Sequence, residues 1–138
     1  MKNKICLIGG AGFLGSHLIN SYHDEDLTVI DIVEEDKLIS NNFNYVNYRK
    51  SGFEILAKEK FDFIFFLAGN ASVSKSIEDP LFDITTNTIL LLELLEIVKN
   101  NPTKIIFTSS AACLGETSKN LNIPISPYGV SKLASENY

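Results

Sequence analysis

Cysteine is scarce in this chain of 138 residues, which contains only Cys6 and Cys113. Two cysteines so far apart match no spacing of metal ligands and make no disulfide framework. We therefore expect both thiols to be reduced and the protein to hold no metal ion.

Basic residues and long apolar runs are also few, and each shortage excludes a class of partner. The chain has 12 lysines and arginines against 17 aspartates and glutamates, for a formal net charge of −5. No dense basic block is present to neutralise a nucleic-acid backbone, so we expect no DNA or RNA partner. The apolar runs are too short for a signal peptide or a membrane span, so we expect no membrane partner and a cytoplasmic location.

A glycine-rich turn follows the first apolar run. That run ends at Ile8, the turn contains Gly9, Gly12 and Gly15, and an apolar pattern of helical period begins at His17. The turn therefore joins a buried strand to a helix. Without a Cβ, Gly9 can turn sharply, Gly12 lets the backbone approach a phosphate, and Gly15 lets the helix lie close to the strand. The turn and the positive end of the helix predict a pyrophosphate site.

A carboxylate ends the second β-branched run. This residue, Asp31, stands 22 residues after Gly9, where a dinucleotide-binding fold receives the ribose hydroxyls of the adenosine half. Its charge would repel a 2′-phosphate, and Ile32 and Val33 offer no arginine, so the pattern favours NAD over NADP. A solvated acid at a strand end is the alternative interpretation.

Strand and helix patterns alternate along the chain, which predicts one α/β domain over residues 1–138 with a doubly wound parallel sheet of about five strands. The predicted strands lie near Lys4–Ile8, Leu27–Asp31, Tyr45–Tyr48, Phe61–Ala68 and Lys104–Ser109. The predicted helices cover about Phe13–Tyr22, Phe53–Glu59, Pro80–Lys99 and a segment that starts at Pro127. The polar segment Asp36–Asn44 is predicted to be a loop.

The third predicted helix is apolar on more than one face over Ile89–Val98. One stripe must cover the sheet, and the surplus requires a second surface. Another part of the fold or a second subunit could supply it. We expect a homodimer through Ile89–Val98, with burial inside a larger monomer as the alternative.

Tyr128 and Lys132 stand four residues apart, hence on one face of the last predicted helix. A phenol is a weak base at neutral pH because its ordinary pKa is about 10, and a nearby ammonium favours the phenolate. Ser109 and Ser110 place hydroxyls at the carboxyl end of a strand, where open α/β sheets bind ligands. Such a pair alone is common on helix surfaces, but together with the glycine turn it predicts proton-transfer chemistry beside a dinucleotide.

The chain resembles the N-terminal part of the extended short-chain dehydrogenases/reductases, the NAD-dependent nucleotide-sugar epimerase/dehydratase family, over essentially its whole length. The resemblance implies a Rossmann-type fold with NAD as the cofactor. The matching motifs are the turn from Gly9 to Gly15, Asp31, Phe66-Leu67-Ala68-Gly69, Ser76-Ile77-Glu78-Asp79-Pro80, Asn87, Ser109-Ser110-Ala111-Ala112 and Ser126-Pro127-Tyr128-Gly129-Val130-Ser131-Lys132.

The resemblance also implies roles for individual residues. Tyr128 is implied as the catalytic base, Lys132 as the residue that tunes it and binds the nicotinamide ribose, and Ser110 as the hydroxyl partner. Ser109 is the alternative if the alignment shifts by one position. The implied cofactor contacts are Gly9, Gly12, Phe13, Leu14, Gly15, Asp31, Leu67, Ala68, Gly69, Asn87, Tyr128 and Lys132.

Two departures from the family pattern concern binding. Cys113-Leu114-Gly115 stands where many relatives have a tyrosine before the glycine, which affects a substrate contact. Tyr48-Arg49-Lys50 stands where relatives often have an acid near the adenine.

In the family, the tyrosine takes a proton from a sugar hydroxyl while a hydride passes from the same carbon to NAD⁺. Epimerases return the hydride to the other face of the ketone, and dehydratases first eliminate water. We expect this chain to be the cofactor-binding part of such an enzyme, truncated after Lys132, without the C-terminal substrate lobe and inactive alone. A non-catalytic dinucleotide-binding module, or a truncated product that acts through a partner protein, is the alternative.

Overall fold

The computed structural model describes residues 2–33, 43–115 and 123–138. Most of the predicted loop Asp36–Asn44 lies outside these residues. The contacts divide the chain into two compact units. Unit 1 consists of Met1–Ala68 and Glu96–Phe107, and unit 2 consists of Gly69–Leu95 and Thr108–Tyr138. The single domain expected over residues 1–138 stays a prediction.

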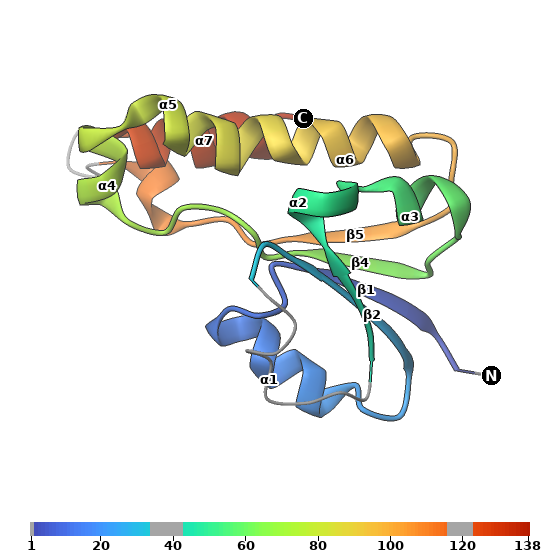
Figure 1. Ribbon diagram of the computed structural model, residues 1–138. Helices are drawn as coiled ribbons and strands as arrows, with labels where there is room; N and C mark the ends of the chain where they lie inside the picture. Colours follow the sequence, from blue (N-terminus) through green and yellow to red (C-terminus); the bar gives the residue numbers. More distant parts are fainter. Residues whose placement is uncertain (1, 34–42, 116–122) are drawn as a thin grey trace. The chain divides into compact units, whose positions relative to one another are not determined.

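Unit 1 contains a five-stranded, wholly parallel sheet in the order β3-β2-β1-β4-β5 (Figure 1). This is the strand order of a Rossmann-type sheet, so the predicted fold class is confirmed. The strands are β1 (Lys4–Ile8), β2 (Asp26–Asp31), β3 (Asn44–Asn47), β4 (Phe63–Phe66) and β5 (Lys104–Phe107).

The centre of the sheet is β1, which pairs with β2 on one side and β4 on the other. Ile5 is opposite Leu27, and Leu7 is opposite Val29. These four side chains form one buried cluster, and Leu18 of helix α1 (Phe13–Ser21) packs against it. Residues 5–8 of β1 are all buried, because helices lie on both sides of the sheet and cover both of its faces (Figure 1). This explains why the sequence of β1 is an unbroken apolar run.

Two short helices follow β3, and the second of them matches the predicted helix Phe53–Glu59, whereas the first was not predicted. They are α2 (Tyr48–Ser51) and α3 (Glu54–Lys58), and Figure 1 shows them on the side of the sheet opposite α1. Strand β3 ends before Tyr48, contrary to prediction, because the Asn47 side chain accepts the Arg49 N–H and caps α2. Gly52, with φ of +55°, then ends α2 in a conformation that L side chains rarely adopt.

Strands β4 and β5 are shorter than predicted. The predictions Phe61–Ala68 and Lys104–Ser109 are wrong at their ends, because the two strands pair only from Phe63 opposite Lys104 to Phe66 opposite Phe107. The apolar residues outside this ladder belong to the connecting segments. An apolar run therefore exceeds the strand wherever the flanking backbone leaves the ladder.

Unit 2 contains a helix that the sequence analysis missed, α4 (Val73–Glu78). It begins at Ser72, whose hydroxyl accepts the Lys75 N–H at 3.2 Å. Asp79 then caps α5 (Pro80–Ile84) by accepting the Phe82 N–H at 2.9 Å. Helix α4 has six residues, too few for a periodic apolar pattern to be recognised.

The predicted long helix Pro80–Lys99 is interrupted by a π-helical turn. After α5 come the π-helical turn η2 (Thr85–Ile89) and the helix α6 (Leu90–Val98). The π turn changes which side chains share a face, and Asn87 and Thr88 are both buried as a result.

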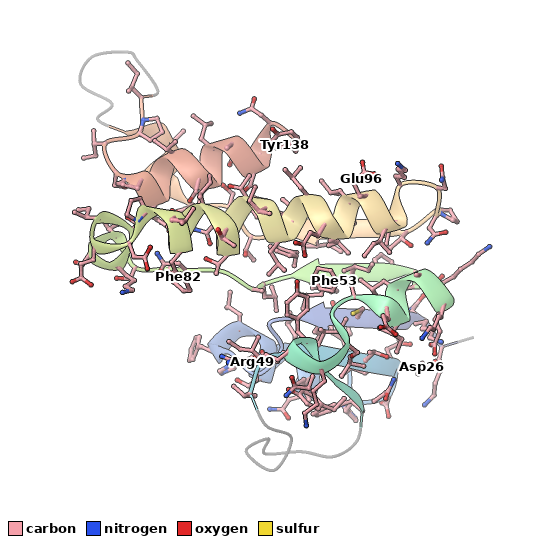
Figure 2. The ribbon with its side chains drawn as sticks, turned by 45° about the horizontal axis from the view of Figure 1, so that its top comes forward. Asp26, Arg49, Phe53, Phe82, Glu96 and Tyr138 are labelled. Atoms are coloured by element: carbon pink, nitrogen blue, oxygen red, sulfur yellow. The ribbon has the colours of Figure 1, made fainter. Side chains whose placement is uncertain are left out.

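The last helix is α7 (Pro127–Glu136), which Ser126 caps by accepting the Gly129 N–H at 3.1 Å. It packs against α4, α5, η2 and the 3-10 turn η3 (Ala111–Leu114). Figure 2 shows α7, which ends near the labelled Tyr138, running along the helical segment that carries Phe82. Within residues 2–33, 43–115 and 123–138, no helix combines the length and apolarity needed to cross a membrane.

Candidate functional site

The glycine turn has the backbone geometry that the sequence predicts. Gly9 has φ of +82°, and a Cβ placed on it would lie 2.5 Å from the Ala68 nitrogen. A Cβ on Gly15 would lie 2.3 Å from the Gly10 oxygen. Contacts this short are incompatible with a side chain at either position, so the turn requires glycine at both. The segment after β4 also lies directly against Gly9. A Cβ placed on Gly9 would be 3.0 Å from the Leu67 carbonyl carbon, so the absence of a side chain allows this approach.

Helix α1 begins at the end of this turn with Gly12 as its N-cap. Gly12 supplies no side-chain acceptor to the N–H groups of the first turn, and such uncapped groups with the positive end of the helix dipole attract an anion. Phe13 and Leu14 are 79% and 54% exposed. The predicted contact residues of the turn therefore surround an open helix N-terminus.

Asp31 lies beside the glycine turn. One carboxylate oxygen accepts the Ala11 N–H at 2.9 Å, and the other accepts the Ile32 N–H at 2.7 Å. The segment after Asp31 is held by β3, because the Tyr45 hydroxyl and the Asn47 amide both donate to the Val33 carbonyl. The oxygen that accepts the Ile32 N–H also accepts the Val33 N–H at 3.3 Å. Since each carboxylate oxygen has two lone pairs, the oxygen that bonds Ala11 is the one that keeps acceptor capacity for a ligand.

Gly69 and Asn87 meet in unit 2. Gly69 has φ of +146°, and a Cβ on it would lie 2.3 Å from Asn87 Oδ1. The Asn87 amide nitrogen donates to Asp83 Oδ1 and to Ser131 Oγ, each at 3.0 Å. These two bonds settle the orientation of the amide and leave Oδ1 buried, with no hydrogen-bond partner among the described residues. Such an oxygen is an acceptor prepared for a donor that a ligand brings.

Helix α7 carries Tyr128 and Lys132 on one face, as predicted. Tyr128 is half-buried, whereas Lys132 is 5% exposed. Burial lowers the pKa of the Lys132 ammonium below its ordinary value, and the neighbouring Cys113, Asp83 and Glu136 oppose that shift. An ammonium this deeply placed is costly unless negative charge or hydrogen bonds surround it.

The two candidate serines have different partners. Ser110 Oγ accepts the Ala112 N–H at 3.2 Å and caps η3, whereas Ser109 Oγ donates to the Glu136 carboxylate. Gly129 allows this segment to approach α7, because a Cβ on it would lie 2.5 Å from the Ala112 oxygen. Only the Ser109 hydroxyl proton is committed to a carboxylate, so Ser110 is the serine better able to donate to a ligand.

The sequence analysis missed several polar residues of unit 2. Asp83 and Ser131 are buried, and both contact Asn87. Ser135 is also buried and donates to the Asn87 carbonyl at 3.0 Å. The available signal is the spacing of four residues between Asp83 and Asn87, and again between Ser131 and Ser135, within segments that are otherwise rich in apolar residues.

Comparison with known proteins gives the family. The model of the NAD dependent epimerase/dehydratase family matches residues 5–138. The chain belongs to this family. The predicted resemblance is thereby confirmed, and NAD is the cofactor of the epimerase/dehydratase family.

Similar proteins of the epimerase/dehydratase family include several 4-epimerases. The UDP-glucose 4-epimerase of Mycoplasma pneumoniae is 31% identical over 157 residues, which cover 98% of this chain and 46% of that protein. The UDP-N-acetylglucosamine 4-epimerase of Methanobrevibacter ruminantium M1, solved with UDP-N-acetylmuramic acid, has a TM-score of 0.83 at 31% identity. The match covers 100% of this chain and 50% of that protein's chain. The UDP-glucose 4-epimerase of Brucella ovis, solved with NAD, has a TM-score of 0.83 at 26% identity, with coverage of 98% and 46%.

The chain spans about half the length of the curated relatives it matches, with 46% of the Mycoplasma pneumoniae protein covered. Among the residues that the structure describes, no three or more histidine, cysteine, aspartate or glutamate side chains form a group suited to a metal ion. The candidate residues thus form two groups, each within its own unit: the glycine turn with Asp31 in unit 1, and the polar cluster with Tyr128 and Lys132 in unit 2.

Proposed function

We propose that this chain is the NAD-binding part of a nucleotide-sugar epimerase or dehydratase, and that the reaction is 4-epimerisation. The observation that carries the proposal is the uncapped start of α1 beside the Asp31 carboxylate, which itself bonds the Ala11 N–H of the glycine turn. The 4-epimerases among its relatives support the choice of reaction.

The residues of unit 1 fit the adenosine and pyrophosphate part of NAD. Gly9 and Gly15 leave no room for side chains in the turn, and the first N–H groups of α1 are directed at an anion. Asp31 keeps acceptor capacity for the ribose hydroxyls, and its charge disfavours a 2′-phosphate. These features support NAD rather than NADP.

The residues of unit 2 fit the nicotinamide half and the sugar. Asn87 Oδ1 is a buried acceptor without a partner among the described residues, and the Lys132 ammonium donates to the ribose. Tyr128 Oη takes the proton of the sugar hydroxyl, and Ser110 Oγ holds the same oxygen. NAD supplies the hydride acceptor when it is bound.

The substrate class that we propose is a UDP-sugar. Two structures of similar proteins were solved with UDP-linked compounds, the Methanobrevibacter ruminantium enzyme and the UDP-glucose 4-epimerase of Thermotoga maritima with UDP-glucose. Which sugar this protein converts is decided by the pocket around the sugar ring.

We also propose that the protein is a homodimer. Ile89 and Ile97 are 44% and 37% exposed on the segment Ile89–Val98, while Leu91 and Leu94 are buried. These isoleucines offer an apolar strip on which a second copy of the chain can pack. Light scattering of the protein should give the mass of a dimer, and Ile89→Glu should give the mass of a monomer.

Calorimetric titration with NAD⁺ and NADP⁺ tests the cofactor assignment. We expect NAD⁺ to bind at least about tenfold more tightly than NADP⁺, since the 2′-phosphate meets the Asp31 charge. Asp31→Ala should weaken NAD⁺ binding and narrow the preference. Asp26→Ala is the matched control, because Asp26 is an exposed acid at the other end of β2. Equal or tighter binding of NADP⁺ by the unmodified chain would show that the assignment is wrong.

Turnover is tested in the natural protein that contains this chain. Tyr128→Phe should abolish the interconversion of UDP-glucose and UDP-galactose and leave NAD⁺ affinity nearly unchanged, since only the hydroxyl is lost. Near-normal turnover would exclude Tyr128 as the base. NAD⁺ binding without any turnover of the unmodified protein would favour the non-catalytic module instead.

A further inference from the structure

Three segments of unit 2 meet at one buried carboxylate. Asp83, on α5, is completely buried. Its Oδ1 accepts the Asn70 amide at 2.7 Å and the Asn87 amide at 3.0 Å, and its Oδ2 accepts the Ser131 hydroxyl at 2.6 Å. Each donor belongs to a segment that carries proposed site residues, because Asn70 follows Gly69 and Ser131 precedes Lys132.

We infer that Asp83 is a positioning residue, whose carboxylate binds Asn87 and Ser131 and so sets where the Asn87 amide oxygen and the Tyr128/Lys132 face of α7 lie. The inference rests on the proposed function, because it gives Asp83 a role in that same site. A role confined to holding the fold together is the competing explanation, and the two make different predictions.

The orientation of the Asn87 amide depends on Asp83. An asparagine side chain can turn its oxygen and nitrogen over unless its neighbours are pure donors or pure acceptors. An ionised carboxylate only accepts, so it selects the amide nitrogen of Asn87 and directs Oδ1 towards Gly69. Without this acceptor, both orientations of the amide would be populated.

The position of α7 depends on the same carboxylate through Ser131. The Ser131 hydroxyl lies 2.6 Å from Asp83 Oδ2 and 3.0 Å from the Tyr128 carbonyl, and it accepts from the Asn87 amide. Ser131 lies between Tyr128 and Lys132 in the sequence, on the buried side of α7. A bond at this point therefore limits both the rotation and the sliding of the helix that carries the two proposed catalytic side chains.

The charge of Asp83 also acts on Lys132. Burial lowers the pKa of Lys132, and Cys113 on η3, Asp83 on α5 and Glu136 on α7 each raise it. Tyr128 lies one helical turn earlier on the same face of α7. In the folded chain, a neutral residue in place of Asp83 would lower the pKa of Lys132 further, because one of the charges that raise it would be lost.

Two substitutions separate the bonds of Asp83 from its charge. Asp83→Asn keeps an oxygen for Asn70 and Asn87, and its new amide nitrogen can donate to Ser131, whose proton then turns to the Tyr128 carbonyl 3.0 Å away. Asp83→Ala removes all three bonds. Asp79→Asn is the matched control, because it neutralises an acid of the same segment and leaves the cap of α5 possible.

The experiment measures the Lys132 titration by NMR of ¹³Cε-labelled lysine, with Lys132→Arg to assign the signal, and NAD⁺ affinity by calorimetry. We expect Asp83→Asn to lower the Lys132 titration midpoint while Asp79→Asn leaves it unchanged. At a pH where Lys132 is still protonated, Asp83→Ala should weaken NAD⁺ binding by more than about tenfold, and Asp83→Asn should restore most of the affinity.

Each outcome distinguishes a positioning role of Asp83 from a role confined to stability. The Asp83→Ala variant could bind NAD⁺ as tightly as the Asp79→Asn variant and differ from it only in a lower melting temperature. That result would show that the role of Asp83 is confined to stability. If Asp83→Ala does not fold, the Asp83→Asn titration decides, and an unchanged Lys132 midpoint overturns the inference. If the unmodified chain binds no NAD⁺, the proposed function fails, whereas the Lys132 titration still tests the contact between Asp83 and α7.

Discussion

The interiors of the two units are built from different kinds of side chain. In unit 1 nearly all buried residues are apolar, and most of them lie on adjacent strands, namely Ile5, Cys6, Leu7, Ile8, Leu27, Val29, Ile30, Ile64 and Phe66. In unit 2 many are polar, namely Ser76, Asp83, Asn87, Thr88, Ser131, Lys132 and Ser135. The first interior is held by the backbone ladder and by packing, and the second by directed hydrogen bonds between side chains.

This difference separates stability from precision. Apolar burial is non-directional and roughly proportional to area, so it tolerates changes of shape that conserve volume. A buried polar network is favourable only when every member finds its partner, and it therefore selects one arrangement of the helices. Unit 1 is suited to hold a glycine turn on a stiff sheet, and unit 2 is suited to hold the proposed catalytic side chains in place.

The largest effect is expected from truncating the apolar interior of unit 1. Leu7→Ala removes a completely buried side chain from the central strand and should lower the free energy of unfolding by about 2–5 kcal/mol, from lost burial and the cavity that remains. Urea denaturation followed by circular dichroism measures it. Leu7→Ile is the control, with an expected loss below about 1.5 kcal/mol. Equal losses for the two variants would mean that this interior is as sensitive to shape as unit 2.

A smaller effect is expected from removing one hydroxyl from unit 2. Ser135 donates to the Asn87 carbonyl at 3.0 Å and contacts Thr88 Oγ1 at 3.2 Å. Ser135→Ala should lower the free energy of unfolding by about 1–3 kcal/mol, because it leaves buried polar atoms without their partner. Denaturation of Ser135→Ala beside Ser74→Ala, an exposed serine on α4, measures the difference. No difference between them would contradict the view that hydrogen bonds hold unit 2.

Two buried groups, one in each unit, should change stability in opposite directions at alkaline pH. Burial raises the pKa of the Cys6 thiol in unit 1 above its ordinary value of 9.0. The unfolded thiol thus loses its proton first, and this group lowers stability as the pH rises through 9.0. Burial lowers the pKa of Lys132 in unit 2 below 10.5, so the unfolded state binds more protons and this group raises stability as the pH rises towards 10.5.

Unfolding free energies at pH 7 and pH 10 test these opposite slopes. Relative to the unmodified chain, Cys6→Ala should lose less stability between the two pH values, and Lys132→Met should lose more. Each slope is at most about 1.4 kcal/mol per pH unit. Slopes of the same sign for the two variants would contradict the burial of one of these groups.

The smallest effect is expected from a surface ion pair. Lys58 and Glu54 on α3 are 3.0 Å apart, but their side chains are 71% and 65% exposed. Lys58→Ala should lower the free energy of unfolding by no more than about 0.5 kcal/mol, because water screens the pair. The same denaturation assay applies, with Glu54→Ala as the complementary variant. If Lys58→Ala lowered the free energy of unfolding as much as Ser135→Ala, the view that buried contacts contribute more to stability than surface ion pairs would be wrong.

Much of unit 1 could be predicted from the sequence, because its signals are local. The run ending at Ile8, the glycine turn and the acid at Asp31 each mark one end of an element, and the structure places Asp31 against that turn. The ends of β4 and β5 could not be predicted, because a strand ends where its neighbour stops pairing. The end of such a strand is set by the neighbouring strand, so the sequence of the strand itself does not indicate it.

Unit 2 was harder to predict, because its geometry depends on contacts between distant segments. The spacing of Tyr128 and Lys132 predicted a shared helix face, and that face exists. The π turn at Thr85–Ile89 and the roles of Asp83 and Ser131 had no comparable local signal.

The sequence by itself determined the parallel α/β sheet, the glycine turn and the family, since apolar period, glycine placement and motif spacing are properties of short segments. Only the tertiary structure decided the hydrogen-bonded cluster around Asp83, the orientation of the Asn87 amide and the different partners of Ser109 and Ser110. The sequence around a polar side chain does not indicate which residue will be its hydrogen-bond partner. Its bonds are chosen when segments more than 40 residues apart pack together, such as Asp83 and Ser131 with a separation of 48.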